Sequence, residues 1–254
     1  LQIYCDFYGY SMIATGAARI LGIQLMRNFD APLLSQSTSE LWHRWHISLS
    51  SWFKDYLYIP LGGNRKGKLR KHLNILITFT VSGLWHGANW TFVVWGFLNG
   101  MYQIIGDLLK PVRSFVIRVL SLKRDGIGMT VLRIVFTFSL YTISMIFFRS
   151  ASVWEAWQII LGILHADNIW ILFDGTLAMG TGLAQQDIGL LIAALGVLLF
   201  SDILRYKNIS AQEIIAKQDW LCQIVIIVFS FLFIMLFGVW GSDYDAANFI
   251  YFQF

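Results

Sequence analysis

Apolar stretches long enough to enter a lipid bilayer alternate with short clusters of lysine and arginine along this chain. Hydrophobic residues make up 57% of the chain and charged residues only 13%, whereas a soluble domain is typically about 25% charged. The basic residues gather in 65–71, 110–124 and 205–217. Basic loops between apolar segments mark the cytoplasmic side of a membrane. The pattern therefore predicts a multi-pass membrane protein and gives no indication of nucleic-acid binding.

Helices are the element that these apolar stretches favour, because a single segment in lipid must satisfy its own backbone hydrogen bonds. Membrane-spanning helices are predicted over 130–149, 187–204 and 220–240. Residues 152–165 predict an amphipathic helix, and the glycine-containing residues 168–186 predict a loop or a re-entrant segment. The predicted fold class is all-α: a polytopic transmembrane protein with additional amphipathic or re-entrant helices.

One membrane-embedded domain is predicted over residues 1–254, since no internal repeat or linker divides the chain. The chain begins inside a hydrophobic segment and without a methionine. We therefore expect it to be the C-terminal portion of a longer protein, with N-terminal helices missing. Cys5 and Cys222 lie in apolar surroundings without a CxxC spacing, so two buried free thiols are expected rather than a disulfide.

An amphipathic or re-entrant helix is predicted to start at residue 37. Ser37 and Glu40 have the spacing of a capping box. An aromatic-rich stripe follows at helical spacing: Leu41, Trp45, Leu49, Trp52 and Tyr56. His43 and His46 lie on one face of such a helix, but a metal site there lacks an evident third ligand. His43 is interpreted as an interfacial polar residue, and His46 as a candidate for chemistry.

The segment LWHGANW, residues 84–90, interrupts an apolar region with an ionisable side chain. The helix predicted before it, residues 73–84, would be about 18 Å long, which would leave His86 inside the protein at membrane depth. Ionisable residues at that depth are costly and mostly functional. A neutral imidazole is a good general base, so His86 is the leading catalytic candidate. A packed histidine bonded to a backbone carbonyl is the alternative.

Four motifs in order resemble the membrane-bound O-acyltransferase family. They are YCDFYGYSMIATGAARILGI, NFDAPLLSQSTSELWHRWHISLSSWFKDYLYIPLGGNR, SGLWHGANWTFVVWG and the terminal FIYFQF. The resemblance is closest to the bacterial alginate O-acetyltransferase branch. It implies transmembrane helices around a central funnel, with His86 as the catalytic histidine and His46 as a second important histidine. It also implies Trp85 and Asn89 as pocket residues. The family's usual serine in the first motif is Tyr8 here, which would alter the local pocket.

The resemblance implies an O-acyltransferase of the bacterial inner membrane. An acyl thioester such as acetyl-CoA would be the donor, attracted by the basic residues 65–71. No metal or redox cofactor is expected, because a thioester is already activated. His86 would take the proton of the acceptor hydroxyl, with His46 or Asn89 orienting the ring or stabilising the oxyanion. The acyl group would reach an extracytoplasmic polysaccharide through periplasmic acetyltransferase partner proteins. Tyr251, in the aromatic tail, is a candidate acyl carrier or else an interfacial anchor.

Other functions stay open at this point. The same fold could transfer D-alanyl groups or acylate peptidoglycan, because nothing in the chain identifies the acceptor. A transporter would also contain broken helices and buried polar residues, but it should show repeated halves, and we find none. A non-catalytic scaffold for polysaccharide export would predict that changing His86 to alanine disturbs packing alone.

Overall fold

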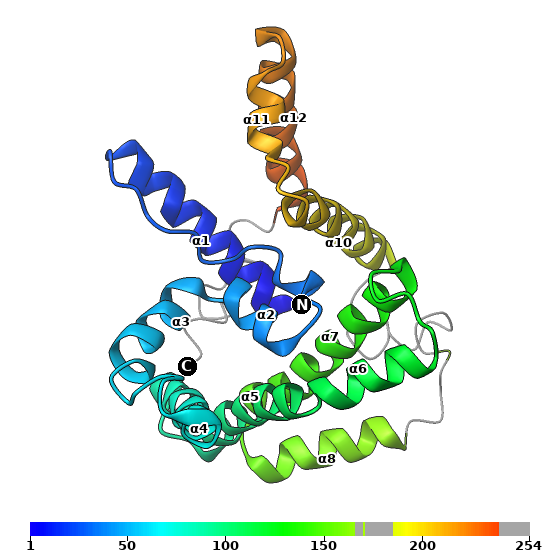
Figure 1. Cartoon of the computed structure of the whole chain (residues 1–254). Coiled ribbons are helices and arrows are strands. Elements are labelled where there is room, and N and C mark those ends of the chain that lie inside the picture. Colours follow the sequence, from blue (N-terminus) through cyan, green and yellow to red (C-terminus); the bar gives the residue numbers. More distant parts are fainter. Residues whose placement is uncertain (166–169, 171–184, 239–254) are drawn as a thin grey trace. The chain divides into compact units, whose positions relative to one another are not determined.

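The computed structural model describes residues 1–165, 170 and 185–238, and every regular element in these ranges is a helix (Figure 1). The elements are α1 Gln2–Ile20, η1 Pro32–Leu34, α2 Thr38–Arg44, α3 Ile47–Phe53, η2 Lys54–Tyr58, α4 Gly67–His86, α5 Trp90–Leu108, α6 Lys110–Val119, α7 Ile127–Arg149, α8 Val153–Leu164, α10 Gln185–Tyr206, α11 Ala211–Ala216 and α12 Trp220–Phe237. The all-α prediction is confirmed. The chain groups into two compact units, one formed by 1–26 with 198–254 and the other by 27–197.

Three of the described helices are long and apolar enough to cross a membrane. They are α7, the Ile188–Tyr206 part of α10, and α12. Helices α5 and α6 together count as one further candidate membrane span, which is bent by 49° between the two helices. The helices predicted over 130–149, 187–204 and 220–240 are therefore confirmed, as is the shorter helix predicted over 152–165, which is α8.

Two segments expected to be basic loops are largely helical. Helix α4 begins at Gly67 inside the first basic cluster and has 20 residues, which gives about 30 Å of helix. The short helix predicted over 73–84 was wrong, so the depth of His86 no longer follows from helix length. Helix α6 occupies two thirds of the predicted loop 110–124, because its apolar residues recur at helical spacing between the cations.

The amphipathic helix predicted from residue 37 starts where expected but is broken at His46. The Ser37 hydroxyl accepts a hydrogen bond from the Glu40 backbone N–H at 3.1 Å, which confirms the predicted cap. However, α2 ends at Arg44, and His46 adopts a left-handed conformation with φ 45° and ψ 54°. That conformation costs a non-glycine residue roughly 1–2 kcal/mol, so other contacts must hold it.

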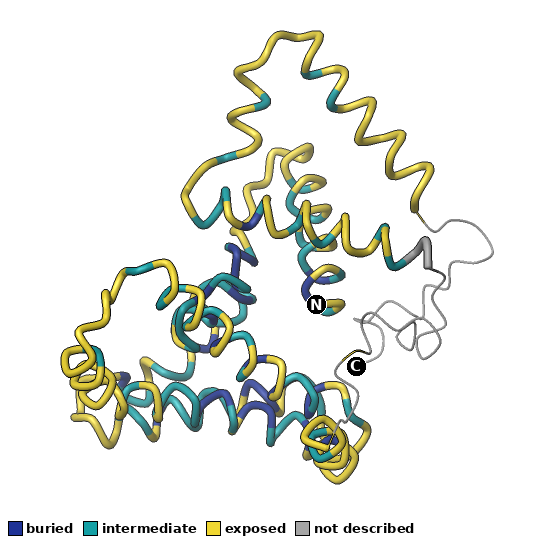
Figure 2. The backbone as a smooth tube through the Cα atoms, turned by 90° about the vertical axis from the view of Figure 1, so that its right-hand side faces the viewer, coloured by how far each residue is buried: buried dark blue, intermediate teal, exposed yellow. Residues whose placement is uncertain are grey.

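In the unit 27–197, α4 packs along α5, α5 packs on α7, and α2 contacts both α5 and α7. Figure 2 shows buried residues in dark blue along these helices. The largest buried apolar side chains of this unit are Phe29, Leu41, Trp45, Phe53, Trp95, Tyr141, Phe147 and Phe148. The core of this unit is therefore rich in aromatic rings, and both candidate histidines belong to the same unit.

The other unit joins α1 to α10 through a buried polar contact. The Tyr4 hydroxyl lies 3.0 Å from each carboxylate oxygen of Asp202, and both side chains are almost fully buried. Tyr8 stacks on Tyr4 with ring centroids 5.4 Å apart, and the Arg205 guanidinium lies 5.1 Å from the centre of the Tyr8 ring. The ring at position 8 therefore has a packing role between α1 and α10.

Both cysteines are free thiols, as expected, but they are exposed rather than buried. Cys222 belongs to α12, in which no residue is buried against the rest of the chain. The prediction of burial was wrong because the apolar faces around the thiols are not covered by other described helices. Such uncovered apolar faces suit contact with lipid.

Candidate active site

His86 is the last residue of α4, and its half-buried ring lies among four aromatic rings. Ring centroids lie 5.1 Å away at Trp85, 5.2 Å at Trp95, 5.1 Å at Phe148 and 6.4 Å at Phe92. These rings come from α4, α5 and α7, so three helices build the surroundings of one imidazole. Burial lowers the pKa of His86 to about 4, and α4 is not among the helices that qualify as membrane spans. A neutral His86 is able to accept a proton.

The break after His86 is fixed by Asn89. Its side-chain oxygen accepts a hydrogen bond from the Thr91 backbone N–H at 3.2 Å and caps α5. Its amide nitrogen lies 3.4 Å from the Ala151 carbonyl oxygen, just beyond the end of α7. Asn89 thus ties the α4–α5 turn to α7. Trp85, the other predicted pocket residue, lies next to His86 and is 55% exposed.

His46 is held by the segment that precedes α2. Its Nδ1 lies 3.1 Å from the side-chain oxygen of Asn28. The same oxygen lies 2.9 Å from the Ser48 hydroxyl, and the Asn28 backbone carbonyl accepts from the Ile47 N–H at 2.9 Å. Burial, and then the charge of His86, lower the pKa of His46 to about 4. Asn28 therefore supports both the left-handed backbone of His46 and its ring.

The structure brings the two predicted histidines within electrostatic reach of each other. Repulsion from His86 in its protonated form contributes to the lowered pKa of His46, although 40 positions separate the two residues in sequence. The Trp42 ring of α2, the helix that precedes His46, lies 5.6 Å from the Trp95 ring, which in turn lies 5.2 Å from His86. Two imidazoles from separate elements thus lie within electrostatic reach of each other.

The family's sequence model, described as "MBOAT, membrane-bound O-acyltransferase family", matches residues 1–169 and so covers both histidines. The chain belongs to the membrane-bound O-acyltransferase family.

The curated relatives of this chain are named for several different acceptors. The chain is 37% identical over 207 residues to a "probable alginate O-acetylase" of Pseudomonas aeruginosa, which covers 82% of this chain and 37% of that protein. It is 34% identical over 168 residues to a peptidoglycan O-acetyltransferase of Helicobacter pylori, covering 66% of this chain and 30% of that protein. It is 37% identical over 113 residues to a teichoic acid D-alanyltransferase of Streptococcus thermophilus, covering 42% and 27%. The chain thus spans less than half the length of these curated relatives.

Four side chains at this site had no role in the sequence predictions: Asn28, Ser48, Trp95 and Phe148. Asn28 and Ser48 lie within the second of the motifs quoted above, so the motif drew attention to their segment but not to their contact with His46. Nothing in the sequence of α7 distinguishes Phe148 from its apolar neighbours. Tyr251, the predicted acyl carrier, lies outside the described residues.

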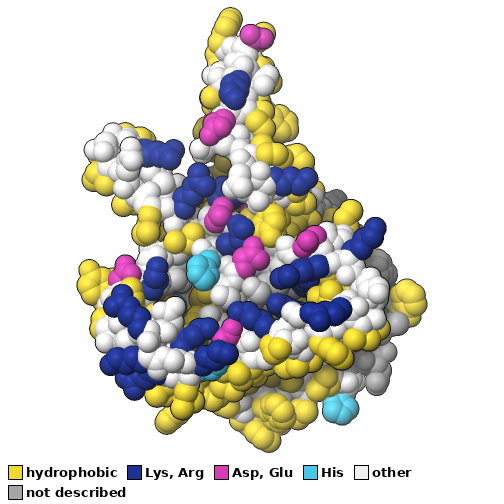
Figure 3. Space-filling view, viewed as in Figure 1, with side chains coloured by type: hydrophobic (Ala, Val, Ile, Leu, Met, Phe, Trp, Pro, Cys, Tyr) yellow, Lys and Arg dark blue, Asp and Glu magenta, His cyan; other side chains and the backbone are white. Residues whose placement is uncertain are grey.

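Cations gather on one face of the unit that holds the histidines. Figure 3 shows Lys and Arg side chains over the start of α4 and along α6. Among them, Lys71 and Lys110 each lie 2.7 Å from a carboxylate oxygen of Asp107, and His72 lies 3.1 Å from the same carboxylate. Arg65, Lys66, Lys68 and Arg70 are exposed. This surface can attract an anionic molecule.

The described residues contain no group of three or more side chains that could hold a metal ion. His43 belongs to α2, where its Nδ1 lies 2.6 Å from the Ser39 carbonyl oxygen, whereas His46 lies past the helix end. The break between them removes the shared helix face on which a two-histidine metal site would depend.

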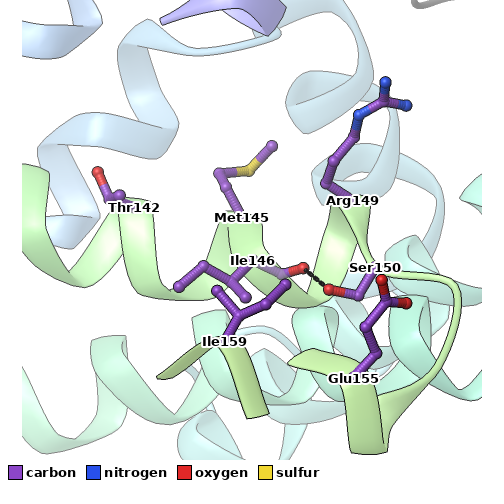
Figure 4. A pocket seen from close by; sticks show the side chains of 7 residues that line it. All are labelled: Thr142, Met145, Ile146, Arg149, Ser150, Glu155 and Ile159. Carbon is purple, nitrogen blue, oxygen red and sulfur yellow. Dashed lines mark hydrogen bonds between the residues drawn. The ribbon is translucent and has the colours of Figure 1, made fainter. Parts of the chain in front are cut away.

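A pocket of about 400 Å³ lies between α7 and α8 (Figure 4). It is lined by Thr142, Met145, Ile146, Arg149, Ser150, Glu155 and Ile159. The Ser150 hydroxyl donates to the Ile146 carbonyl at 2.7 Å, and Glu155 accepts from the Ala151 N–H at 2.8 Å. These polar groups serve the helix ends, and neither candidate histidine lines the pocket. We therefore place the candidate active site at His46 and His86.

Proposed function

We propose that the complete protein is an inner-membrane O-acyltransferase that moves an acetyl group from a cytosolic thioester toward a hydroxyl of an exported polysaccharide. The observation that carries the proposal is that the half-buried imidazole of His86 lies among aromatic rings of three helices and within electrostatic reach of His46. Both lie in the part of the chain that the family's sequence model matches. The similarity to alginate O-acetylases favours acetyl as the group and an alginate-like polymer as the acceptor.

The proposed reaction begins with His86 as general base. As the acceptor oxygen attacks the thioester carbonyl, its proton passes to the neutral imidazole and a C–O bond forms. The C–S bond then breaks, and the imidazolium returns the proton to the thiolate that leaves. Burial that keeps His86 neutral favours the first step. No group from outside the protein and its two substrates is needed for this balance.

The donor is proposed to approach over the cationic surface at the start of α4, where exposed arginines and lysines would attract the phosphates of a carrier such as CoA. The product is proposed to reach the polymer through extracytoplasmic acetyltransferase partners. Peptidoglycan acylation and D-alanyl transfer remain alternative functions, because relatives with those names also match the chain.

The test is the ester content of the exported polymer in cells that lack the gene and express the complete protein as His86→Ala or His86→Gln. Glutamine keeps a similar size but has no basic nitrogen. We expect both variants to lose acetylation at normal membrane levels. The control is His165→Gln, since His165 is exposed at the end of α8.

Undiminished acetylation in both His86 variants would overturn the proposal and favour a scaffold. Loss of polymer export together with loss of esters would favour a transporter instead. If esters are lost from peptidoglycan or teichoic acid rather than from the exported polysaccharide, the reaction class stands and the proposed acceptor is wrong.

A further inference from the structure

Three donors point to a single side-chain atom of Asn28. Its Oδ1 lies 3.3 Å from the Ser48 backbone nitrogen, 2.9 Å from the Ser48 hydroxyl and 3.1 Å from His46 Nδ1. The oxygen and nitrogen of an amide are hard to tell apart by shape alone. A backbone N–H, however, can only donate. The atom that faces Ser48 must therefore be the oxygen of Asn28, which settles the orientation of this amide.

The orientation of Asn28 determines where His46 carries its hydrogen. An amide oxygen can only accept, so His46 Nδ1 must donate to it and must be protonated. The Ser48 hydroxyl lies farther from Nδ1, at 3.4 Å, and is closer to the Asn28 oxygen. In a neutral imidazole one nitrogen carries the hydrogen and the other accepts. Nε2 of His46, which is buried, is then the accepting nitrogen.

We infer that Asn28 holds His46 in the tautomer with hydrogen on Nδ1, so that Nε2 can accept a hydrogen bond but cannot donate one. Asn28 and Ser48 are accordingly positioning residues. The inference rests on the proposed function and deepens it. In this tautomer His46 cannot donate to the oxyanion that forms on the thioester carbonyl. Of the two roles open to His46, stabilising the oxyanion is therefore excluded, and the proton of the acceptor hydroxyl goes to His86 alone.

Backbone hydrogen bonds hold the turn at His46 and so keep its ring beside Asn28, which fixes the tautomer. The left-handed turn is held by the Ile47 N–H, which donates to the Asn28 carbonyl at 2.9 Å. Two residues further on, the Asp30 N–H donates to the Arg44 carbonyl at 3.0 Å, and Arg44 returns a bond to the Asp30 carbonyl at 3.0 Å. Segment 28–30 and turn 44–48 are thus joined by several bonds, and strained backbone held in this way is typical of functional sites.

The direct test is a ¹⁵N NMR spectrum of histidine-labelled complete protein in lipid nanodiscs, with the His46 signals assigned by their loss in His46→Gln. Nitrogen shifts distinguish a protonated from a bare ring nitrogen. We expect Nδ1 of His46 to be protonated and Nε2 to be bare near pH 7. This measurement needs neither substrate nor activity, so it is independent of the proposed reaction.

Two variants of Asn28 connect the tautomer to the reaction. Asn28→Asp keeps an acceptor for all three donors, and we expect it to keep the Nδ1–H signal and most of kcat. Asn28→Leu removes the acceptor, and we expect a mixture of tautomers and a kcat lower by roughly 10- to 100-fold, by analogy with the loss of a hydrogen-bond partner of a metal-ligating histidine. KM for the thioester should change little, because the donor does not contact Asn28 in this scheme.

The control for burial is Asn74→Leu. Asn74 is fully buried in the same unit, but its amide donates to the carbonyls of Leu61 and Gly63, away from His46. We expect this variant to lose stability without any change in the His46 signals.

A wild-type spectrum with hydrogen on Nε2 would overturn the inference, and so would an Asn28→Leu protein with an unchanged spectrum and unchanged kcat. If Asn28→Leu does not fold, the wild-type and Asn28→Asp spectra still show which nitrogen of His46 carries the hydrogen. The two proposals can fail separately. An unprotonated Nδ1 in an enzyme that requires His86 would overturn the inferred tautomer alone. Full acetylation by His86→Gln would overturn the proposed reaction alone.

Discussion

Gly83 of α4 and Gly96 of α5 face each other so closely that neither has room for a methyl group. A Cβ atom on Gly83 would collide with the Phe92 carbonyl oxygen, and one on Gly96 would collide with the Phe79 carbonyl oxygen. Close approach through small residues is typical of helix pairs in membranes. This contact also determines where two residues of the candidate site lie. His86 follows Gly83 by one helical turn and Trp95 precedes Gly96, so this contact brings the imidazole beside its aromatic partner.

The first prediction concerns this helix crossing. Gly83→Ala should force α4 and α5 apart, and overpacking of this kind costs roughly 1–3 kcal/mol. The unfolding midpoint of the complete protein in detergent would measure the loss. Gly106→Ala is the matched control on α5, because a Cβ there meets nothing within 4 Å. An equal effect of the two substitutions would show that the close approach does not limit stability.

The second prediction concerns the aromatic surroundings of His86. Phe147 and Phe148 are adjacent and similarly buried, at 8% and 7% exposed, but the structure places the Phe148 ring against His86. Changing either residue to leucine should cost about 1–2 kcal/mol of stability. We expect Phe148→Leu alone to lower acetyl transfer several-fold, since the imidazole loses a wall of its site. Transfer rates per folded protein would check this, and equal rates for both variants would contradict it.

The features that the sequence predicts well are set by neighbouring residues. The cap by Ser37 and the break in the helical pattern within residues 84–90 each depend on side chains within a few positions. The long apolar helices α7 and α12 can be predicted from the sequence for the same reason. Local propensity and periodicity suffice for such features.

The break at His46 could not be predicted from its own segment. Trp45 and its neighbours keep helical spacing across the break, and the bonds that hold the left-handed turn come from Asn28, 18 positions earlier. The proximity of His46 to His86 likewise depends on how α2 and α4 pack on α5. The spacing between the two histidines in the sequence says nothing about this proximity, and the motifs indicated it only through resemblance.

The third prediction concerns the buried pair that joins α1 to α10. Tyr4→Phe removes a hydroxyl that lies 3.0 Å from both oxygens of Asp202, which is 2% exposed. Weakening the solvation of a buried carboxylate should cost roughly 1–3 kcal/mol. Chemical unfolding of the complete protein would measure it. Tyr56→Phe, at an exposed position, should be nearly neutral.

A double substitution would test whether the loss comes from the pair itself. Replacing both partners by apolar groups avoids leaving one of them buried and unsatisfied. Tyr4→Phe combined with Asp202→Leu should therefore be less destabilised than the sum of the two single variants. Additive losses would mean that Tyr4 and Asp202 act independently of each other.

The fourth prediction concerns pH. His46 lies between α2 and α3, outside the helices that qualify as spans, and its pKa is about 4 in the folded protein, against an ordinary value of 6.5. As pH falls below 6.5, the unfolded chain therefore binds a proton on this ring before the folded protein does. By linkage, stability falls through the window from about 6.5 to about 4. The contribution of this ring is at most roughly 3 kcal/mol.

Other groups also titrate in this window, so the difference between wild type and His46→Gln isolates the ring. Unfolding free energy measured from pH 7 to pH 4 should fall more steeply in wild type than in the variant. Parallel curves would show that His46 titrates alike in both states. An NMR midpoint for the folded ring near 6.5 would contradict the burial argument directly.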